Sequence, residues 1–354
     1  SSIWAVALAD GRTQAFRVQA DEQGQAVIEP IALTPAQLPP GTPPLLKVEG
    51  ETAVLPVVPT DAASLQTHPV FLPDTQQMVS VQAGGDLLFW NEDQTDFTRL
   101  AVNALPDARI LVDEAGRLLL LTGPTDRYGH GVLGDSLEAA GITLIETRPE
   151  PKVVTTIPIP EPTVVEGIAP IWTDLDGDGA REIIVTLSNS DQGAQVAVFS
   201  EAGEPVATGP AIGRGQRWRH QLVAGPFGLN GETELVDVLT PHIGGTVEFY
   251  RLDGNQLRIV AQVPGYTSHV IGTRNLDMAV GGDFDGDGRV ELLLPDQRRT
   301  ELGAIQRTGD GAGVDWRLPL EGVVTTNLAA VSLADGRLVV GAGRGDGVLR
   351  LWGF

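Results

Sequence analysis

The chain has 354 residues, enough for two average domains or for one large repeat fold. Its net charge of −22 argues against nucleic acids and anionic membrane surfaces as partners, because both require a basic protein surface. The absence of cysteine excludes disulfides, thiolate nucleophiles and Cys-ligated zinc. No apolar run approaches the roughly 20 residues that a membrane-spanning helix needs.

Short Val-, Ile- and Leu-rich segments, closed by Gly, Pro, Asp or Asn, follow one another along the chain, which is the pattern of β-strands between turns. In chain order, the predicted strands are Met78–Gln82, Asp86–Trp90, Arg109–Val112, Leu118–Thr122, Ile142–Ile145, Glu182–Leu187, Gln195–Phe199, Leu235–Leu239, Thr246–Tyr250, Leu257–Val263, Val290–Leu294, Arg337–Val340 and Val348–Trp352. Helical periodicity is almost absent, although Asp135–Ala140 could form one helical turn. The predicted class is all-β.

One segment recurs along the sequence. Residues 168–185 match residues 276–294, and residues 222–236 form a degenerate copy. With three fainter copies, the repeats start near residues 69, 108, 168, 222, 278 and 328. Successive starts lie about 40–60 residues apart, which is the length of a four-stranded propeller blade. The sequence therefore predicts a single β-propeller domain over residues 1–354.

The chain ends are predicted to close the propeller ring together. The last repeat has room for only three strands before Phe354, so a strand within Ile3–Val18 is expected to supply the fourth. Such closure leaves no open sheet edge. The rest of the first 67 residues can form one further blade, so we expect seven blades, with six as the alternative.

Two repeats contain the pattern D-x-D-G-D-G-x-x-E. Three carboxylates at alternate positions converge only where the backbone curls tightly, and the glycines permit that curl. A hard, all-oxygen donor set favours Ca²⁺ over Zn²⁺ or Cu²⁺. The expected ligands are the Asp side chains at positions 1, 3 and 5, the main-chain carbonyl at position 7 and the Glu at position 9. They are Asp174, Asp176, Asp178, Ala180 and Glu182 in the first loop, and Asp283, Asp285, Asp287, Arg289 and Glu291 in the second.

Other interpretations of these loops are less favoured. An EF-hand needs a Glu at position 12 and flanking helices, but Val185 or Leu294 stands there and a strand follows. An acidic turn without metal is the other alternative, and two full copies at equivalent repeat positions argue against it. The degenerate copy has Pro226 and Gly228 in place of Asp, so no metal is predicted there.

The run from Gly282 to Gly288, followed by Glu291 and an apolar strand, resembles the FG-GAP/VCBS repeat family. This family includes the propeller of integrin α chains and many bacterial surface proteins. The match covers two repeats of about fifty residues and is faint elsewhere. The resemblance implies that each acidic loop joins the innermost strand of a blade to the second strand, on the lower face. It also implies that the calcium is structural.

The resemblance further implies that ligands meet the opposite, upper face. That face is built from the loops before each inner strand and the loops between the second and third strands, and all five histidines map to them. The candidate partner-binding residues are His68, Arg127, Tyr128, His130, Arg217, Trp218, His220, His242, Tyr266 and His269. Scattered polar loop residues without a shared role are the alternative, and a transition-metal site of two or three histidines is a further option. The long insertion Pro124–Gly141 is predicted to contact a partner.

The leading hypothesis is a non-catalytic, calcium-stabilised propeller that binds a protein or glycan. It would lie outside the cytosol, in the periplasm, secreted or at the cell surface, as calcium availability and the family resemblance indicate. No G-x-S-x-G or H-E-x-x-H motif occurs. One alternative is a sugar-acting lyase or dehydratase, since some relatives of the repeat family use upper-face His, Arg or Tyr. Another is a structural subunit of a larger cell-surface or membrane-peripheral assembly, suggested by apolar loop residues such as Val132, Leu133 and Ile243.

Overall fold

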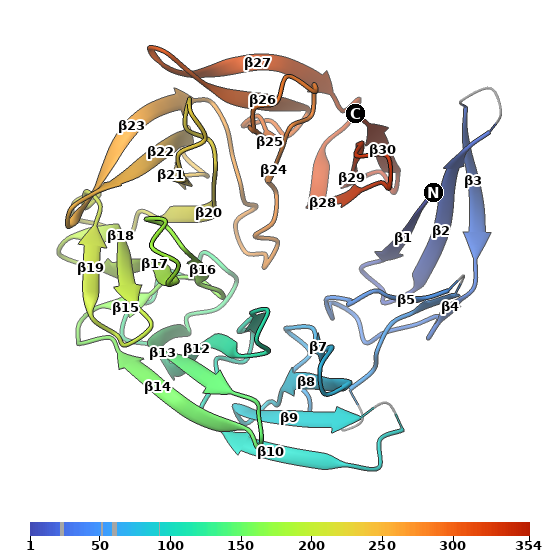
Figure 1. The fold of residues 1–354 in the computed structure, drawn as a ribbon, viewed down its shortest axis with the longest axis horizontal. Coiled ribbons are helices and arrows are strands. Elements are labelled where there is room, and N and C mark those ends of the chain that lie inside the picture. Colours follow the sequence, from blue (N-terminus) through green and yellow to red (C-terminus); the bar gives the residue numbers. More distant parts are fainter. Residues whose placement is uncertain (22–24, 51, 59–61, 92) are drawn as a thin grey trace. The chain divides into compact units, whose positions relative to one another are not determined.

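The computed structural model describes residues 1–354 except residues 22–24, 51, 59–61 and 92 (Figure 1). The described residues form β-strands, turns and loops and contain no helix, which confirms the all-β class. By its internal contacts the chain divides into two compact units. The first comprises Ser1–Pro124 and Gly141–Pro158, and the second comprises Thr125–Ala140 and Ile159–Phe354.

The first unit begins with a three-stranded antiparallel sheet and a small sheet of short strands. Two antiparallel four-strand groups follow, and β12 and β13 extend a few residues beyond the unit. The strands are β1 (Ser2–Ala7), β2 (Thr13–Ala20) and β3 (Ala26–Ile31); β4 (Leu33–Thr34), β5 (Lys47–Glu49) and β6 (Thr52–Val54); β7 (Val70–Leu72), β8 (Gln77–Val81), β9 (Asp86–Asn91) and β10 (Phe97–Ala101); and β11 (Leu111–Val112), β12 (Leu118–Thr125), β13 (Glu138–Glu146) and β14 (Lys152–Pro158).

The second unit consists of successive antiparallel sheets in which each strand pairs with its sequence neighbour. The short β15 (Val164–Val165) also pairs with β17. The strands are β16 (Ile171–Thr173), β17 (Glu182–Asn189), β18 (Gly193–Ser200) and β19 (Pro205–Thr208); β20 (Arg219–Gly225), β21 (Glu234–Leu239), β22 (Thr246–Asp253) and β23 (Gln256–Pro264); β24 (Val280–Gly282), β25 (Glu291–Pro295), β26 (Glu301–Thr308) and β27 (Gly311–Pro319); and β28 (Val324–Ser332), β29 (Leu338–Arg344) and β30 (Leu349–Gly353).

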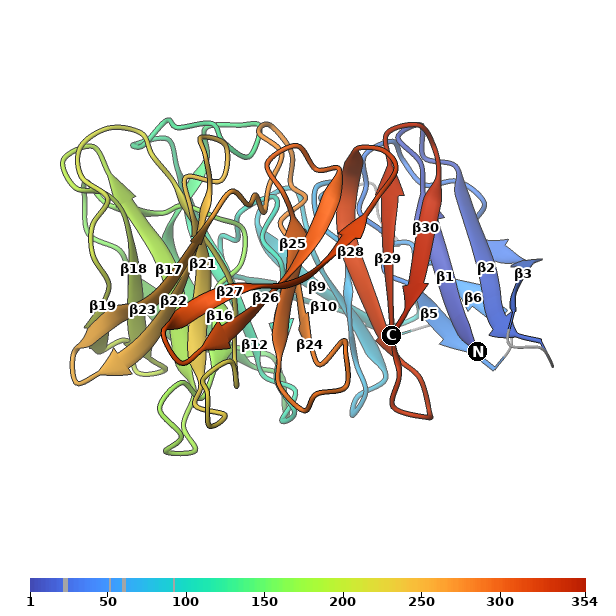
Figure 2. The same ribbon diagram turned by 90° about the horizontal axis from the view of Figure 1, so that it is seen from above.

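The sheets of the second unit lie side by side in sequence order, with their first strands on the inner side of an arc and their last strands on the outer side (Figure 1). The strands run between two ends from which the connecting loops project (Figure 2). Since neighbouring strands are antiparallel, the loops between first and second strands lie at one end. The loops between second and third strands, and those leading into the next sheet, lie at the other. We call these the lower and upper ends of the second unit.

Apolar side chains fill the space between neighbouring sheets. Val236 and Phe249 of one sheet belong to the same buried cluster as Leu292 and Ile305 of the next. A second cluster joins the sheet of β24–β27 to that of β28–β30, and a third joins β16–β19 to β20–β23. Neighbouring sheets thus pack face to face through the apolar side chains that point into the space between them. A series of four-stranded sheets packed in this way is the blade architecture of a β-propeller.

Every strand predicted above overlaps an observed strand. One expectation is wrong, because Asp135–Ala140 contains a bend followed by the start of β13 at Glu138 instead of a helical turn. Residues 138–146 pair with β14 over most of their length, and this pairing outweighs a weak local helical preference. The last sheet has three strands, and β1 pairs with β2 in the first unit. Closure of the ring by both chain ends and the number of blades therefore stay predictions.

Candidate functional site

The two acidic loops occupy the same place in two sheets. Residues 174–181 connect β16 to β17, and residues 283–290 connect β24 to β25. Each loop therefore follows the inner strand of its sheet and leads into the second strand (Figure 1). By the definition above, both loops lie at the lower end of the second unit. This is the connection that the family resemblance implies for a calcium loop.

The first aspartate organises the backbone of each loop. Asp283 accepts hydrogen bonds from the main-chain N–H groups of Gly286 (2.8 Å) and Gly288 (2.9 Å). Asp174 accepts the same bonds from the two corresponding glycines, at 2.6 and 2.9 Å. Gly286 and Gly288 have φ of 77° and 84°, a region that only glycine adopts readily. The loops thus share one hydrogen-bond pattern.

Carboxylate oxygens converge within each loop. In the second loop, one oxygen from each of Asp283, Asp285, Asp287 and Glu291 lies within 4.8 Å of the others. The corresponding group in the first loop is Asp174, Asp176 and Glu182, and Asp178 lies outside it. The remaining expected ligands are main-chain carbonyls, and the N–H groups of the same residues, Ala180 and Arg289, donate to Asp178 and Asp287 at 2.7 and 2.8 Å.

The glutamate at the ninth position is the buried member of each group. Burial, and to a smaller extent the neighbouring aspartates, raise the pKa of Glu182 and Glu291. Among the described residues, no arginine or lysine forms an ion pair with any carboxylate of the two loops. Arg289 acts electrostatically on Asp287 without pairing with it. Dense oxygen donors that form no ion pair with an arginine or lysine are the donor set that a hard divalent cation fits.

The degenerate copy provides its counter-charge from arginines, which the sequence analysis missed. Glu234, at the position equivalent to Glu291, is fully buried. Its carboxylate accepts a hydrogen bond from Arg251 (2.6 Å) and another from Arg307 (2.8 Å) on the next sheet. The sequence did contain a signal for this pairing, because Glu234 is retained although the aspartates of the motif are lost. A buried carboxylate needs a partner, which here could not be a metal held by those aspartates.

At the upper end, three histidine rings surround Trp218. The His220 ring stacks on the indole, with 4.7 Å between centroids, and the His242 ring lies nearly parallel to it at 6.0 Å. The His269 ring meets the indole edge-on at 5.1 Å and lies 5.0 Å from the His242 ring. Trp218, His220 and His269 are buried, and His242 is half-buried. We call His130, His220, His242, His269 and Trp218 the histidine cluster.

Hydrogen bonds fix the protonation of the central pair. The Nε2 atom of His269 lies 2.8 Å from the Thr273 carbonyl oxygen, which can only accept, so this nitrogen carries a hydrogen. In the neutral ring Nδ1 is then an acceptor, and it receives the Nε2–H of His242 at 2.8 Å. Burial and the neighbouring His269 and His130 lower the pKa of His242 to about 4. Burial also lowers the pKa of His269. The pair is therefore neutral at pH 7.

His130 joins the cluster from the long insertion, now seen as the loop 126–137 between β12 and β13. Its Nδ1 lies 2.5 Å from a carboxylate oxygen of Glu166, which is buried and also accepts from the Ser188 hydroxyl. Trp218 donates its indole N–H to the main-chain carbonyl of Glu166 at 3.2 Å. An imidazole held by a carboxylate can act as a general base.

The insertion packs down onto the second unit. Val132 and Leu133 form a buried cluster with Ile168 and Trp218. The Gly272 N–H donates to the Val132 carbonyl at 2.8 Å, so the insertion is bonded to the loop 265–279. An ion pair between Asp135 and Arg274 (2.5 Å) joins the same two segments.

The structure brings four of the five histidines together and leaves the other candidates in varied places. His68 lies in the first unit, where its Nδ1 is 2.9 Å from the Pro69 carbonyl oxygen. Tyr128 and Tyr266 are buried, and Tyr266 fits against Gly303, where a Cβ would meet its hydroxyl at 2.4 Å. Arg127 donates to the Ile159 carbonyl and the exposed Arg217 to the Ile212 carbonyl, both at 2.7 Å.

The histidines do not assemble a three-ligand metal site in this conformation. Among the described residues, the groups of three or more donor side chains within 4.8 Å of one another are the two acidic ones. The short His242–His269 contact is already occupied by a hydrogen bond. Of the candidate residues in the second unit, Arg217 is exposed and Arg127, His130 and His242 are half-buried, so these four can contact a partner directly. His68 of the first unit is also half-buried.

Two exposed isoleucines flank the histidine pair. Ile243 follows His242 and is 75% exposed, and Ile271 lies two residues after His269 and is 65% exposed. They are the most exposed large apolar side chains among the described residues. By contrast, none of the described Tyr and Trp side chains is in the exposed class. We call Ile243, Ile271 and His242 the upper rim.

A buried charged network lies just below the cluster, within the sheet of β20–β23. Arg219 donates from one nitrogen toward Glu248, Asp237 (3.3 Å) and the Tyr250 hydroxyl (2.5 Å). All four side chains are buried. Burial, reinforced by Glu248 and opposed by Arg219, raises the pKa of Asp237 to about 7. One guanidinium cannot neutralise two buried carboxylates, so the network retains a proton.

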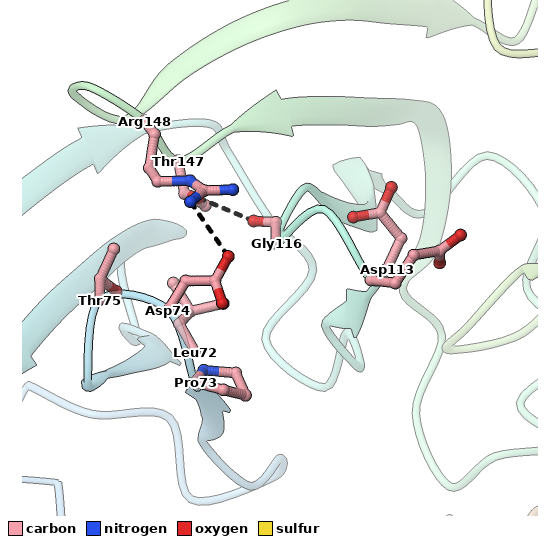
Figure 3. Close-up of a pocket in the computed structure, with 9 residues that line it drawn as sticks. Leu72, Pro73, Asp74, Thr75, Asp113, Gly116, Thr147 and Arg148 are labelled. Atoms are coloured by element: carbon pink, nitrogen blue, oxygen red, sulfur yellow. Dashed lines mark hydrogen bonds and ion pairs between the residues drawn. The ribbon is translucent and has the colours of Figure 1, made fainter.

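A small cavity of about 90 Å³ lies in the first unit, lined by Leu72, Asp74, Asp113 and Arg148 among others (Figure 3). An ion pair between Arg148 and Asp74 (3.0 Å) spans it, and the Thr147 hydroxyl donates to the Gly116 carbonyl beside it (Figure 3). Asp113 is paired with Arg117 (2.7 Å), so the cavity offers no evident catalytic group among these residues.

Comparison with known proteins identifies the fold. No protein-family model and no curated protein matches the chain. Among solved structures, BamB from Moraxella catarrhalis is similar over 100% of this chain and 98% of its own, with a TM-score of 0.51 and 13% identity. The Dos1 propeller matches 80% of this chain with a TM-score of 0.49 and 9% identity, and this chain covers 64% of it. The chain has a β-propeller fold, as predicted.

Among the described residues, none forms a helix with the length and apolar character needed to traverse a bilayer.

Proposed function

We propose that this chain is a non-catalytic, calcium-stabilised β-propeller that acts outside the cytosol and binds a protein partner through its upper rim. The observation that carries the binding proposal is the pair of exposed isoleucines held on a packed and hydrogen-bonded rim. The similarity to FG-GAP/VCBS repeats is part of this proposal and rests on the two acidic loops.

The calcium proposal rests on the comparison of three equivalent loops. In two loops the converging carboxylates form no ion pair with an arginine or lysine among the described residues. The third loop lacks the aspartates, and its glutamate pairs with two arginines. At each of the three loops, the buried carboxylate therefore needs a compensating positive charge. Asp283, Asp285, Asp287 and Glu291 would bind one Ca²⁺, and Asp174, Asp176 and Glu182 would bind another. The ion would supply charge compensation and cross-linking of two strands, with no part in a reaction.

The upper rim supports a protein partner better than a glycan. Exposed apolar side chains on an ordered surface mark protein contacts. The aromatic side chains that usually supply an amphipathic contact surface are absent from the exposed described residues, since all three tyrosines are buried and no tryptophan is in the exposed class. His130 and Glu166 by themselves place no nucleophile or anchoring cation beside a substrate, so the geometry favours binding over catalysis.

A location outside the cytosol follows from the calcium proposal. Calcium at the concentrations that fill weak structural sites of about 10⁻⁴–10⁻³ M is found in extracellular modules. The lack of cysteine is compatible with such a compartment and does not require it.

The binding proposal is tested by substituting the rim. The immobilised wild-type chain should retain a partner protein from a periplasmic or surface extract of the source cells. The double variant I243D/I271D should not retain it, because two carboxylates would be placed in an apolar contact. L229D is the matched control, since Leu229 is 44% exposed but lies between β20 and β21, at the lower end of the same sheet. Retention lost in L229D and kept in I243D/I271D would refute the proposal.

A further inference from the structure

We propose that the histidine cluster is a proton-operated latch, which holds the loops 126–137, 240–245 and 265–279 together at neutral pH and releases them in acid. The consequence for a partner rests on the proposed function, because the upper rim is carried on two of these loops. The latch itself is a property of the chain alone.

The latch is a chain of contacts that joins three separate segments over Trp218. His242, on the loop 240–245, donates to His269 on the loop 265–279 (2.8 Å). His269 donates onward to the Thr273 carbonyl of its own loop (2.8 Å). That loop is bonded to the insertion 126–137 through Gly272 and Val132 (2.8 Å). His220, under the indole, bonds Ser268 of the same loop (2.8 Å).

Protonation of His269 is incompatible with this arrangement, and protonation of His242 is opposed by its surroundings. His269 already uses its Nε2 hydrogen on a carbonyl, so a proton added at Nδ1 would place two N–H groups head to head and break the bond to His242. A proton on His242 keeps that bond but puts a charge into a half-buried site beside a second histidine ring at 5.0 Å. Both burial and mutual repulsion therefore oppose charging of the pair.

The charged groups around the pair do not relieve this cost. His242 faces His269, the Trp218 ring and His130. His269 faces His242, His220, the Trp218 ring and the neutral Thr267 and Thr273 groups. The Glu166 carboxylate is bonded to His130 and Ser188. Asp135 is paired with Arg274 across the insertion and the loop 265–279. Opening of these loops in water removes the penalty, so acid shifts the population toward the open state.

Release of the latch would move the upper rim. Ile243 is bonded through its own loop and Ile271 lies within the loop 265–279. The His242–His269 contact joins the two loops that carry these side chains. A partner that binds the closed rim would therefore bind more weakly in acid. Binding in neutral surroundings and release in acidic ones is the regulation that we assign to this site.

Hydrogen exchange of the wild-type chain, in excess calcium, tests the latch without a partner. A histidine with a pKa of about 4 when packed and 6.5 when released predicts about a 20-fold increase in loop opening between about pH 7 and pH 5. Peptides that cover residues 265–279 should lose about that factor of protection, after correction for the intrinsic exchange rate. Peptides from β17 and β18 are expected to keep theirs, and peptides covering 174–182 show whether a calcium loop has opened instead.

Two glutamine variants separate the latch from general acid effects. H242Q removes the titration of His242, so its protection over residues 265–279 should fall much less in acid than that of the wild type, with the remaining response coming from His269. H68Q, which removes the histidine of the first unit, should behave like the wild type. Unchanged protection of the wild-type loop in acid, or a full acid response in H242Q, would overturn the latch. Failure of the rim variants to affect partner retention would overturn the binding proposal and leave this result standing.

Discussion

Arg219, Asp237 and Glu248 show how one residue's ionisation is set by its surroundings. All three are buried within one sheet, with Arg219 Nε and one Asp237 oxygen lacking a hydrogen-bond partner among the described residues. Burial is the main cause that raises the pKa of Asp237 to about 7; the neighbouring Glu248 adds to it, and Arg219 opposes it. A folded-state pKa above the unfolded value of 3.8 means that the fold binds a proton that the unfolded chain releases.

The contribution of Asp237 to stability is therefore complete below pH 3.8 and is lost as the pH rises toward about 7. D237N removes this titration and keeps the shape of the side chain. We expect the free energy of unfolding of this variant to be higher by on the order of 1 kcal/mol at about pH 8, and to depend less on pH between about pH 5 and 7.

R219Q should instead lower the free energy of unfolding by about 3–5 kcal/mol, because it leaves two buried carboxylates without a cation. Urea unfolding at several pH values measures both effects. Equal destabilisation by the two variants at about pH 8 would contradict the shared-proton account.

At the scale of the element, the loop between the first and second strands of a blade is a position that requires positive charge. Two of these loops present converging carboxylates, and the third presents Glu234 to arginines from β22 and β26. Arg307 lies on the neighbouring sheet, so its pairing with Glu234 also ties two sheets together. On the calcium proposal, a bound ion in two loops and the arginine pair in the third would compensate buried negative charge in equivalent places.

Glu234 and Glu291 should therefore respond differently to a chelator. E234Q leaves Arg307 buried without its carboxylate and should cost about 3 kcal/mol with or without EDTA. E291Q should cost little in EDTA but should lose much of the stabilisation that calcium gives the wild type, because it removes a ligand. Thermal unfolding of both variants in calcium and in EDTA measures this. A calcium-dependent cost for E234Q would show that the arginines do not replace the ion.

The strands and acidic loops could be predicted from the sequence because their signals are local. A four-residue apolar run between turn residues indicates a strand, and carboxylates at alternate positions with glycine indicate a tight loop. Both patterns lie within one short segment of the chain. The outer strand β14 was missed because its residues are mostly exposed and carry no alternation. The division into propeller blades could be predicted from the spacing of the sequence repeats alone.

The arrangement of the histidine cluster could not be predicted, because it depends on contacts between residues far apart in the chain. His130 meets Glu166 36 residues away, and His242 meets His269 27 residues away. The loop assignments placed His130, His220, His242 and His269 at the upper end of the second unit, but His220 is the second residue of β20 and not a loop residue. They gave no indication that Trp218, His220 and His269 are buried under the rim. Burial was decided by the insertion 126–137, whose apolar residues cover the indole.

At the scale of the whole molecule, the proposed calcium ions would each join two strands of a sheet at the lower end of the second unit, and the proposed partner would bind at the upper end. The central claim is that the two acidic loops bind calcium. Native mass spectrometry of the protein after dialysis against calcium measures this directly. We expect two Ca²⁺ ions on the wild-type chain, one in each loop, and one ion on D285A. A wild-type chain without calcium, or D285A with both ions, would contradict the claim.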